Sequence, residues 1–236
     1  MTWSIIARDS ATGQLGVAVA TRFFAVGALV PHIAAGFGAI ATQALVNPYY
    51  GIDGVKLLRD GKSPHDVIMA LLAGDAGRDS RQVHIMDAKG RIAAHSGKDC
   101  VDWFGHISGD GFSIAGNMLA GPAVLDETAR VYADSARLPF AQRLIKAMFA
   151  GEAAGGDQRG KQSAALLIHG TEDWPALDLR VDDHTDPLRE LERLEAVSRE
   201  RWVHFRGFMP TRDNPAGITD RAVIEAAIAN QGSRQT

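Results

Sequence analysis

The chain has 236 residues, of which 46% are hydrophobic and 22% charged, and its formal net charge is -3. This composition fits one globular domain or a closely packed pair, and it argues against a disordered chain. Nucleic acid is not an expected partner, because the chain lacks a basic field to bind phosphates. Gly, Arg or Asp interrupts the apolar runs well short of a membrane span, and residues 1–10 lack a basic leader, so we expect a cytoplasmic protein with no membrane partner.

Strands are predicted at the start of the chain, followed by helices. Residues 2–9 and 14–23 are apolar, β-branched runs joined by a turn at 10–13, and 28–34 and 37–45 read as two further strands ending in a loop at 47–51. The spacing then predicts a helix over 52–59. A second helix should begin at Ser63, an N-cap residue followed by Pro64 and, at the third helical position, Asp66.

The second half repeats this order. Strands are expected at 82–86 and 91–95 and in the region up to Asn117, helices at 122–134 and 139–150, strands at 164–169 and 177–181, and helices at 188–199 and 220–229. Short connections make neighbouring strands antiparallel. The sequence therefore predicts an α+β domain over residues 1–200, with two mainly antiparallel sheets face to face and helices outside, and a C-terminal extension over 201–236 packed on it.

Metal and disulfide chemistry is not expected. Cys100 is the single cysteine, so neither an internal disulfide nor a multi-cysteine zinc site can form, and we predict no metal and no cofactor. Asp182 and His184 are metal-ligand types that share one strand face, but we interpret them as a solvated strand end before the helix cap at Asp186. His84 and His95 are interpreted as surface or hydrogen-bonded interior histidines.

The segment GGDQRGKQS, residues 155–163, is the most informative one. It matches the start of a phosphate-binding G-x-x-x-x-G-K loop, but Gln162 replaces the magnesium-binding Ser or Thr, and a helix precedes the segment while a strand follows it, the reverse of a P-loop. A helix C-cap loop with Asp157 and Arg159 paired is the alternative. Together with Gln162 and Ser163, these polar side chains enter an apolar strand and need partners or a ligand.

Several motifs together resemble a bacterial family of unknown function, numbered 1028. They are GGDQRGKQSAALL from Gly155, LRVDDHTDP from Leu179, GNMLAG from Gly116, and the opening TWSIIARD with TGQLGVAVATRFFAVGALVP. This family is grouped with the N-terminal-nucleophile (Ntn) hydrolase-like superfamily. The resemblance therefore implies a four-layer αββα sandwich, which agrees with the predicted order of strands and helices.

The resemblance also implies a chemistry. In that superfamily the first residue of the mature chain attacks an amide and its own α-amine takes the proton, which activates an otherwise weak hydroxyl nucleophile. Thr2 would be this residue after removal of Met1, and Arg8 or Arg22 would replace the cation that often lies near the nucleophile. We expect a small amide or peptide-like substrate, with the 155–163 loop lining the pocket and Arg159 holding a carboxylate in a bidentate manner.

Side-chain amides are candidates for holding the substrate. Gln43, Asn47 and Asn117 could orient it or donate to an oxyanion, or could serve only as hydrogen-bonding groups in loops. Two alternatives to the Thr2 hydrolase stay open. One is a non-catalytic small-ligand-binding protein that retains Met1, and the other is a hydrolase in which Cys100 pairs with His106, although a lone cysteine is more often a buried apolar residue. A homodimer is expected from the frequency of two-fold assemblies.

Overall fold

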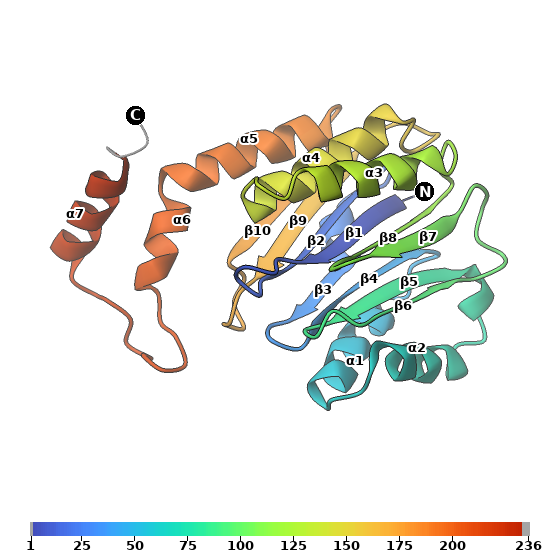
Figure 1. Ribbon diagram of the computed structural model, residues 1–236, viewed down its shortest axis with the longest axis horizontal. Helices are drawn as coiled ribbons and strands as arrows, with labels where there is room; N and C mark the ends of the chain where they lie inside the picture. The colour runs from blue at the N-terminus through green and yellow to red at the C-terminus, as the bar shows by residue number, and fades with distance from the viewer. Residues whose placement is uncertain (1, 233–236) are drawn as a thin grey trace. The chain divides into compact units, whose positions relative to one another are not determined.

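A computed structural model describes residues 2–232 of the chain. The chain divides into two compact units, one ending at Leu191 and the other beginning at Glu192. The first unit holds two antiparallel sheets, both shown in Figure 1. The six-stranded sheet has the order β10 (Leu177–Val181), β9 (Ser163–His169), β2 (Leu15–Thr21), β1 (Thr2–Arg8), β8 (Phe112–Asn117), β7 (Gly105–Gly109). The four-stranded sheet has the order β3 (Pro31–Ala34), β4 (Gly38–Ala44), β5 (Arg81–Asp87), β6 (Ile92–Ser96).

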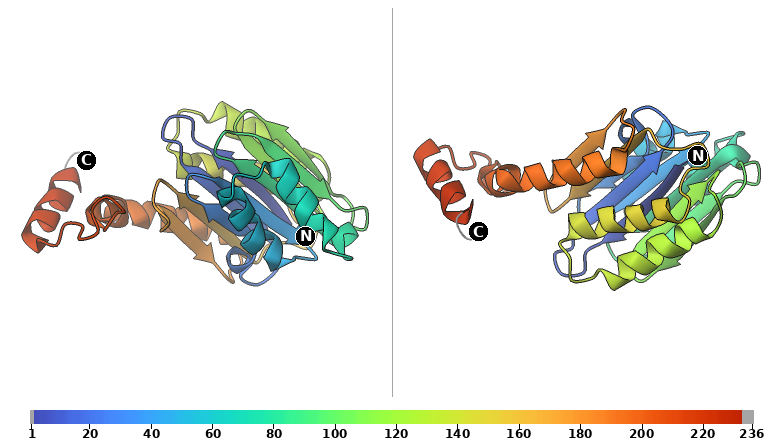
Figure 2. Two further views of the ribbon diagram at one scale, coloured as in Figure 1. Left: turned by 90° about the horizontal axis from the view of Figure 1, so that it is seen from below. Right: turned by 90° about the horizontal axis from the view of Figure 1, so that it is seen from above.

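Helices cover the outer face of each sheet. The helices α3 (Ala123–Asp134) and α4 (Phe140–Ala153) lie on the six-stranded sheet, and α1 (Pro48–Arg59) and α2 (Pro64–Ala73) lie on the four-stranded sheet (Figures 1 and 2). Inner faces of the two sheets pack against each other through β1, β2, β4, β5 and β8. The predicted four-layer αββα sandwich is therefore confirmed.

Strand β1 lies in the middle of the sandwich and is buried on both faces. Ile6 packs into the apolar core between the sheets, whereas Trp3 on the opposite face lies against Gly151 of α4. Side chains alternate along a strand, so Thr2 and Ser4 share the inner face with Ile6. Burial on both faces explains why β1 and β2 read as nearly continuous apolar runs even though their sheet is antiparallel.

Most predicted elements are confirmed within a few residues, but two expectations were wrong. Residues 28–34 do not form one strand: a 3-10 turn at Val26–Ala28 precedes β3, because the amides of Leu29 and Val30 both bond to the Val26 carbonyl. Helix α1 begins at Pro48 rather than residue 52. The side chain of Asn47 accepts a hydrogen bond from the Tyr49 amide and so caps the helix at the segment expected to be a loop.

The second unit contains helical segments. It begins at Glu192, inside α5 (Pro187–Glu200), and continues through α6 (Trp202–Phe205), a 3-10 turn at Arg206–Phe208 and α7 (Arg221–Gly232). Arg201 and Glu225 form an ion pair of 2.6 Å inside this unit. No helix in the described part of the chain is long and apolar enough to cross a membrane.

Candidate functional site

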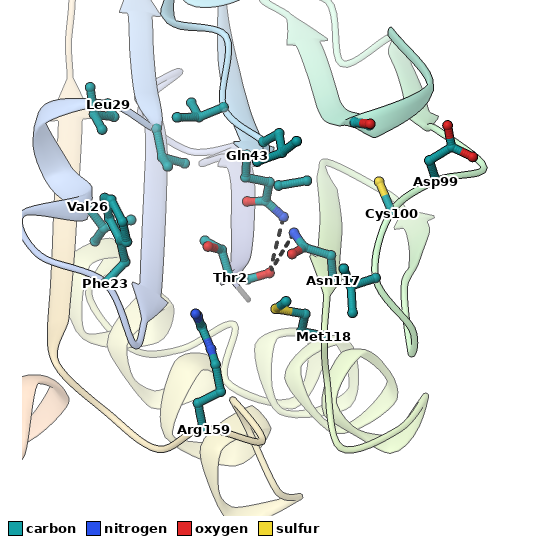
Figure 3. A pocket seen from close by; sticks show the side chains of 16 residues that line it. Thr2, Phe23, Val26, Leu29, Gln43, Asp99, Cys100, Asn117, Met118 and Arg159 are labelled. Atoms are coloured by element: carbon teal, nitrogen blue, oxygen red, sulfur yellow. Dashed lines mark hydrogen bonds between the residues drawn. The ribbon is translucent and has the colours of Figure 1, made fainter. Parts of the chain in front are cut away.

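A cavity of about 360 Å³ opens where β1 begins and where β4 and β8 end (Figure 3). Its walls are mostly apolar and come from the segments 23–30, 44–46 and 100–101 and from Met118. Thr2 lies between two walls: Phe23, Val26 and Leu29 are on one side, and Met118 and Cys100 are on the other. The polar lining residues are Thr2, Gln43, Ser80, Asp99, Asn117 and Arg159. The cavity thus brings four of the predicted site residues together: Thr2, Gln43, Asn117 and Arg159.

Thr2 is held at the floor of this cavity by its neighbours in the sheet. It pairs with Thr21 of β2 on one side and with Asn117 of β8 on the other. Its hydroxyl donates to the Thr21 hydroxyl at 3.1 Å. Within residues 2–232, no carboxylate, imidazole or ammonium group is within hydrogen-bonding distance of the Thr2 hydroxyl. A proton leaving this hydroxyl would therefore need the α-amine of Thr2 itself or a water molecule as its acceptor.

The side-chain amides of Gln43, Gln82 and Asn117 form a buried hydrogen-bond network behind Thr2, called the amide lattice below. Gln43 Nε2 donates to Gln82 Oε1 at 2.8 Å and to the carbonyl of Ala115 at 3.1 Å, and lies 3.4 Å from the Thr2 carbonyl. Asn117 Nδ2 donates to the same Gln82 oxygen at 3.1 Å and lies 3.5 Å from the Thr2 carbonyl. Gln82 Nε2 donates in turn to carbonyls of Gly105 and Gly116. The lattice fixes the backbone of Thr2 from both sheets.

This lattice changes the role expected of the amides. The N–H groups of Gln43 and Asn117 already have acceptors inside the protein, so they are not preformed oxyanion donors. Two acceptors lie beside one end of the Asn117 side-chain amide, so that end is the nitrogen, Nδ2. The other end is therefore the oxygen, Oδ1. No described residue donates to that oxygen. Asn117 consequently offers the cavity a hydrogen-bond acceptor next to Thr2.

The lattice continues into a serine–histidine chain that lies fully inside the sandwich. Ser4 Oγ donates to Gln43 Oε1 at 2.7 Å, so it must accept from His84 Nε2 at 2.8 Å. His84 Nδ1 is then the acceptor for the Ser113 hydroxyl at 3.0 Å. Complete burial lowers the pKa of His84 to about 3, with a smaller contribution from His106. His84 is therefore a neutral, hydrogen-bonded interior histidine, one of the two interpretations made from the sequence.

The glycine-rich segment folds as the C-cap of α4, and not as a phosphate loop. Gly155 and Gly156 have positive φ angles of 119° and 49°, and their amides bond back to carbonyls of Glu152 and Gly151. The Gly160 amide bonds to the Asp157 carbonyl. Because these three amides already have partners, they cannot cradle a phosphate in this conformation.

Asp157 organises the rest of this loop. Its side chain is 2% exposed, and its carboxylate accepts from the amides of Arg22 and Arg159 and from Nε and Nη2 of Arg159. The Asp157–Arg159 pair of the C-cap alternative therefore forms, and it occupies the Nε–Nη2 edge of the guanidinium group, so that edge is not available to a substrate carboxylate. Arg22 is directed at the loop, where its Nη1 donates to the Arg159 carbonyl at 2.7 Å. Arg22 thus supports Arg159 at the cavity edge and is absent from the cavity lining.

Three other candidates have structural partners and also lie outside the cavity lining. Ser163 Oγ donates to the Phe23 carbonyl at 2.5 Å and accepts from the Val26 amide at 3.2 Å. Gln162 Nε2 donates to Asp183 at 3.1 Å. Asn47, besides capping α1, donates to Asp75 at 3.3 Å. Ser163 nevertheless bears on the site, because it ties β9 to the segment that forms one cavity wall.

Backbone strain also gathers around the cavity. In residues 2–232 the non-glycine residues with positive φ are Ala25, Ala44 and Met118, at 53°, 70° and 55°. Ala44 and Met118 line the cavity, and Ala25 lies between the lining residues Phe23 and Val26. Such conformations cost about 1–3 kcal/mol each and cluster at functional sites. Their location supports this cavity as the functional site.

Cys100 and His106 do not form the pair that the cysteine-hydrolase alternative requires. The Cys100 thiol lines the cavity but donates to the Arg81 carbonyl at 3.5 Å, and burial raises its pKa. His106 Nδ1 bonds instead to Ser96 Oγ at 3.1 Å, and burial lowers its pKa. At neutral pH both changes favour the uncharged forms, a thiol and an imidazole. Asp182 pairs with Arg180, and the described residues contain no group of three or more potential metal-binding side chains.

Comparison with known proteins gives a family and a close structural relative. A model of a family of unknown function, DUF1028, matches residues 2–191. The crystal structure of protein SPO2555 from Silicibacter pomeroyi, of the same family, is 32% identical, covers 93% of this chain and 96% of its own, and superposes with a TM-score of 0.87. Anbu, an ancestral β-subunit from Yersinia bercovieri, shares 12% identity, with coverage of 83% and 95% and a TM-score of 0.40, too distant to support an argument. No curated protein matches the chain.

Proposed function

Since the chain belongs to the DUF1028 family, whose activity is not known, we propose a function from the cavity itself. The protein is an amidohydrolase of the Ntn type that acts on a small amide or peptide-like substrate. Thr2 is its nucleophile once Met1, which lies outside the described residues, has been removed. The observation that carries this proposal is the position of the Thr2 hydroxyl, at the floor of a strained, mostly apolar cavity where residues 2–232 place no other side-chain base beside it.

The chemistry follows from that position. Thr2 Oγ attacks the substrate carbonyl carbon while its proton passes to the α-amine of the same residue, whose ordinary pKa of about 7.7–8.0 suits a base near neutral pH. The C–N bond then breaks, and the proton goes to the departing amine. Water hydrolyses the resulting ester, and Thr2 regains its proton. Asn117 Oδ1, the acceptor beside Thr2, orients the substrate by accepting from its amide N–H.

Residues around Thr2 position the groups that react. Gln43 and Asn117 hold the Thr2 carbonyl, which keeps the start of β1 from fraying into the cavity. Arg22 acts indirectly, by holding the loop that carries Arg159. Arg159 borders the cavity below Thr2 (Figure 3).

Covalent labelling tests the proposal. Intact mass first establishes that the mature chain begins at Thr2, and the protein is then treated with a β-lactone, which acylates activated hydroxyl nucleophiles. We expect one adduct, mapped to Thr2, that Thr2→Ser retains and Thr2→Val loses. Thr12→Val, at an exposed turn, is the matched control and keeps the label. An unlabelled mature chain, or an adduct at any other residue, contradicts the proposal.

One observation favours a second candidate, a small-ligand-binding protein that retains Met1. The N–H groups of Gln43 and Asn117 are committed to internal acceptors, so these side chains supply no oxyanion donors. A cellular protein that begins at Met1 and purifies with a small molecule in the cavity would favour this candidate. A Cys100-dependent hydrolase has no such support, because burial holds the thiol in its protonated form. Assembly as a homodimer in the cytoplasm stays a prediction, and light scattering checks the oligomeric state.

A further inference from the structure

The rim of the cavity is apolar as well as its walls. Phe23, Leu45 and Val101 line it while keeping 55%, 66% and 55% of their surfaces exposed. Single exposed apolar residues are ordinary, but several large ones around one opening indicate contact with an apolar group. Behind them, Val26 and Val30 are only 3% exposed and continue the apolar surface inward. An apolar ligand would thus meet a continuous apolar path from solvent to Thr2.

The charged groups at the cavity do not favour an anion. Arg159 and Asp99 are the charged residues of the lining. The charge of Arg159 is compensated by Asp157, whose side chain is 2% exposed and whose two oxygens receive four N–H groups. Asp157 uses the Nε–Nη2 edge of Arg159 and offsets its charge, so this arginine attracts a ligand carboxylate less than an unpaired arginine would. Asp99 adds a negative charge on the opposite side (Figure 3).

The polar groups at the cavity floor fit an amide. Asn117 Oδ1 is an acceptor with no donor among the described residues, and it can receive an N–H from a ligand. A carboxylate, which carries no proton at neutral pH, would place two acceptor oxygens against this oxygen. A neutral amide instead offers both an N–H for Asn117 and a carbonyl for Thr2.

We propose that the cavity selects uncharged amides with an apolar acyl group. The acyl group packs against Phe23, Val26 and Leu29, and the amide lies between Thr2 and Asn117. An uncharged amide thus takes the place of the carboxylate-bearing ligand expected at Arg159. Only the hydrolysis of this amide rests on the proposed function, because binding involves no reaction.

A pair of probes that differ in charge tests the proposal. Calorimetry measures octanamide and octanoate binding to the wild type and to Thr2→Ala, so that hydrolysis does not obscure affinity. We expect octanamide to bind at least about tenfold more tightly than octanoate to both proteins, because octanoate places an acceptor oxygen against Asn117 Oδ1. From butanamide to octanamide, affinity should rise about three- to fourfold per buried methylene. Octanoate binding as tightly as octanamide, or no detectable octanamide binding, overturns the proposal.

A rim variant checks where the ligand binds. Val101→Arg adds a cation at an exposed rim position, so it should raise octanoate affinity and lower octanamide affinity, each several-fold. Met69→Arg, equally exposed but on α2, is the matched control and should change neither. Equal responses of the two variants place the ligand elsewhere and overturn the proposal. If octanamide binds as expected but Thr2 is not labelled by β-lactone, the selectivity stands and the proposed hydrolase fails.

Discussion

Asn117 Nδ2 donates to Gln82 Oε1 across the interface between the two sheets, at 3.1 Å. Gln82 is completely buried on β5, and its own amide donates to carbonyls of Gly105 and Gly116 in the other sheet. It therefore joins the sheets behind Thr2 without lining the cavity. The sandwich and the candidate site depend on the same side chain.

Replacing Gln82 should destabilise the whole domain. Gln82→Leu removes the acceptor of Gln43 and Asn117 and the donor to two carbonyls, which leaves several buried polar groups unsatisfied. We expect a loss of about 2–4 kcal/mol in the free energy of unfolding, measured in urea. Gln142→Leu, at a partly exposed position of α4, should change it by less than about 1 kcal/mol. Equal stabilities of the two variants would show that the lattice contributes little.

The role of Gln82 illustrates what the sequence can and cannot predict. Periodicity and turn residues predict nearly every strand and helix, because local propensity and burial agree along this chain. Gln82 stands at the start of a predicted apolar strand, and a polar residue at an inward-facing position is a detectable signal of a buried network. The hydrogen-bond partners of Gln82 cannot be predicted from the sequence, because Gln43 and Asn117 reach it only when the two sheets pack together.

The glycine-rich segment shows the same limit. Sequence alone predicts the C-cap glycines and the Asp157–Arg159 pair, which are local. It does not predict that the Arg22 amide bonds to Asp157, since that contact joins segments 135 residues apart. Asp157 also occupies one edge of the Arg159 guanidinium group, and the sequence does not show which edge is left for the carboxylate expected there.

Stability should fall as the pH is lowered, because His84 is buried in its neutral form. The pKa of His84 is about 3 in the folded chain, against 6.5 for an ordinary histidine. Above pH 6.5 neither state binds the proton; below it the unfolded chain does and the folded chain does not. Stability is therefore lost from about pH 6.5 down to about pH 3, by up to about 1.4 kcal/mol per pH unit.

The measurement is urea unfolding of the wild type and of His84→Gln at several values between pH 7 and pH 4. His84→Gln is less stable at pH 7, since it disturbs Ser4 and Ser113, but its stability should depend less steeply on pH. His65→Gln, on the surface of α2 with a side chain that is 77% exposed, serves as the control for the substitution. Parallel pH profiles for the wild type and His84→Gln would contradict the assignment.

The Asp157 carboxylate should tolerate no neutral replacement. Each of its oxygens accepts a backbone amide and a guanidinium N–H. Asp157→Asn puts an NH2 group against a backbone N–H in either orientation and also removes the charge that compensates Arg159. We expect a loss of about 2–4 kcal/mol and faster proteolysis within residues 155–163. Asp183→Asn, which changes one exposed acceptor of Gln162, should cost less than about 1 kcal/mol. An Asp157→Asn protein as stable as Asp183→Asn would refute the role given to this carboxylate.

Ser163 should control the cavity wall more than the fold. Its hydroxyl connects β9 to the Phe23 carbonyl and the Val26 amide, and both groups lose their side-chain partner in Ser163→Ala. The expected cost is about 1–2 kcal/mol of stability. Because the wall formed by residues 23–30 is then held by fewer bonds, hydrogen exchange should accelerate there while the central strand β1 stays protected.

Ligand binding distinguishes this local effect from general destabilisation. Octanamide affinity should fall several-fold in Ser163→Ala, because the Phe23 and Val26 surface must be ordered again when the acyl group binds. Ser108→Ala, at an exposed position of β7, is the matched control and should alter neither exchange nor affinity. Exchange that accelerates equally in β1 and in residues 23–30 would mean that Ser163 stabilises the whole sandwich rather than the wall of the site.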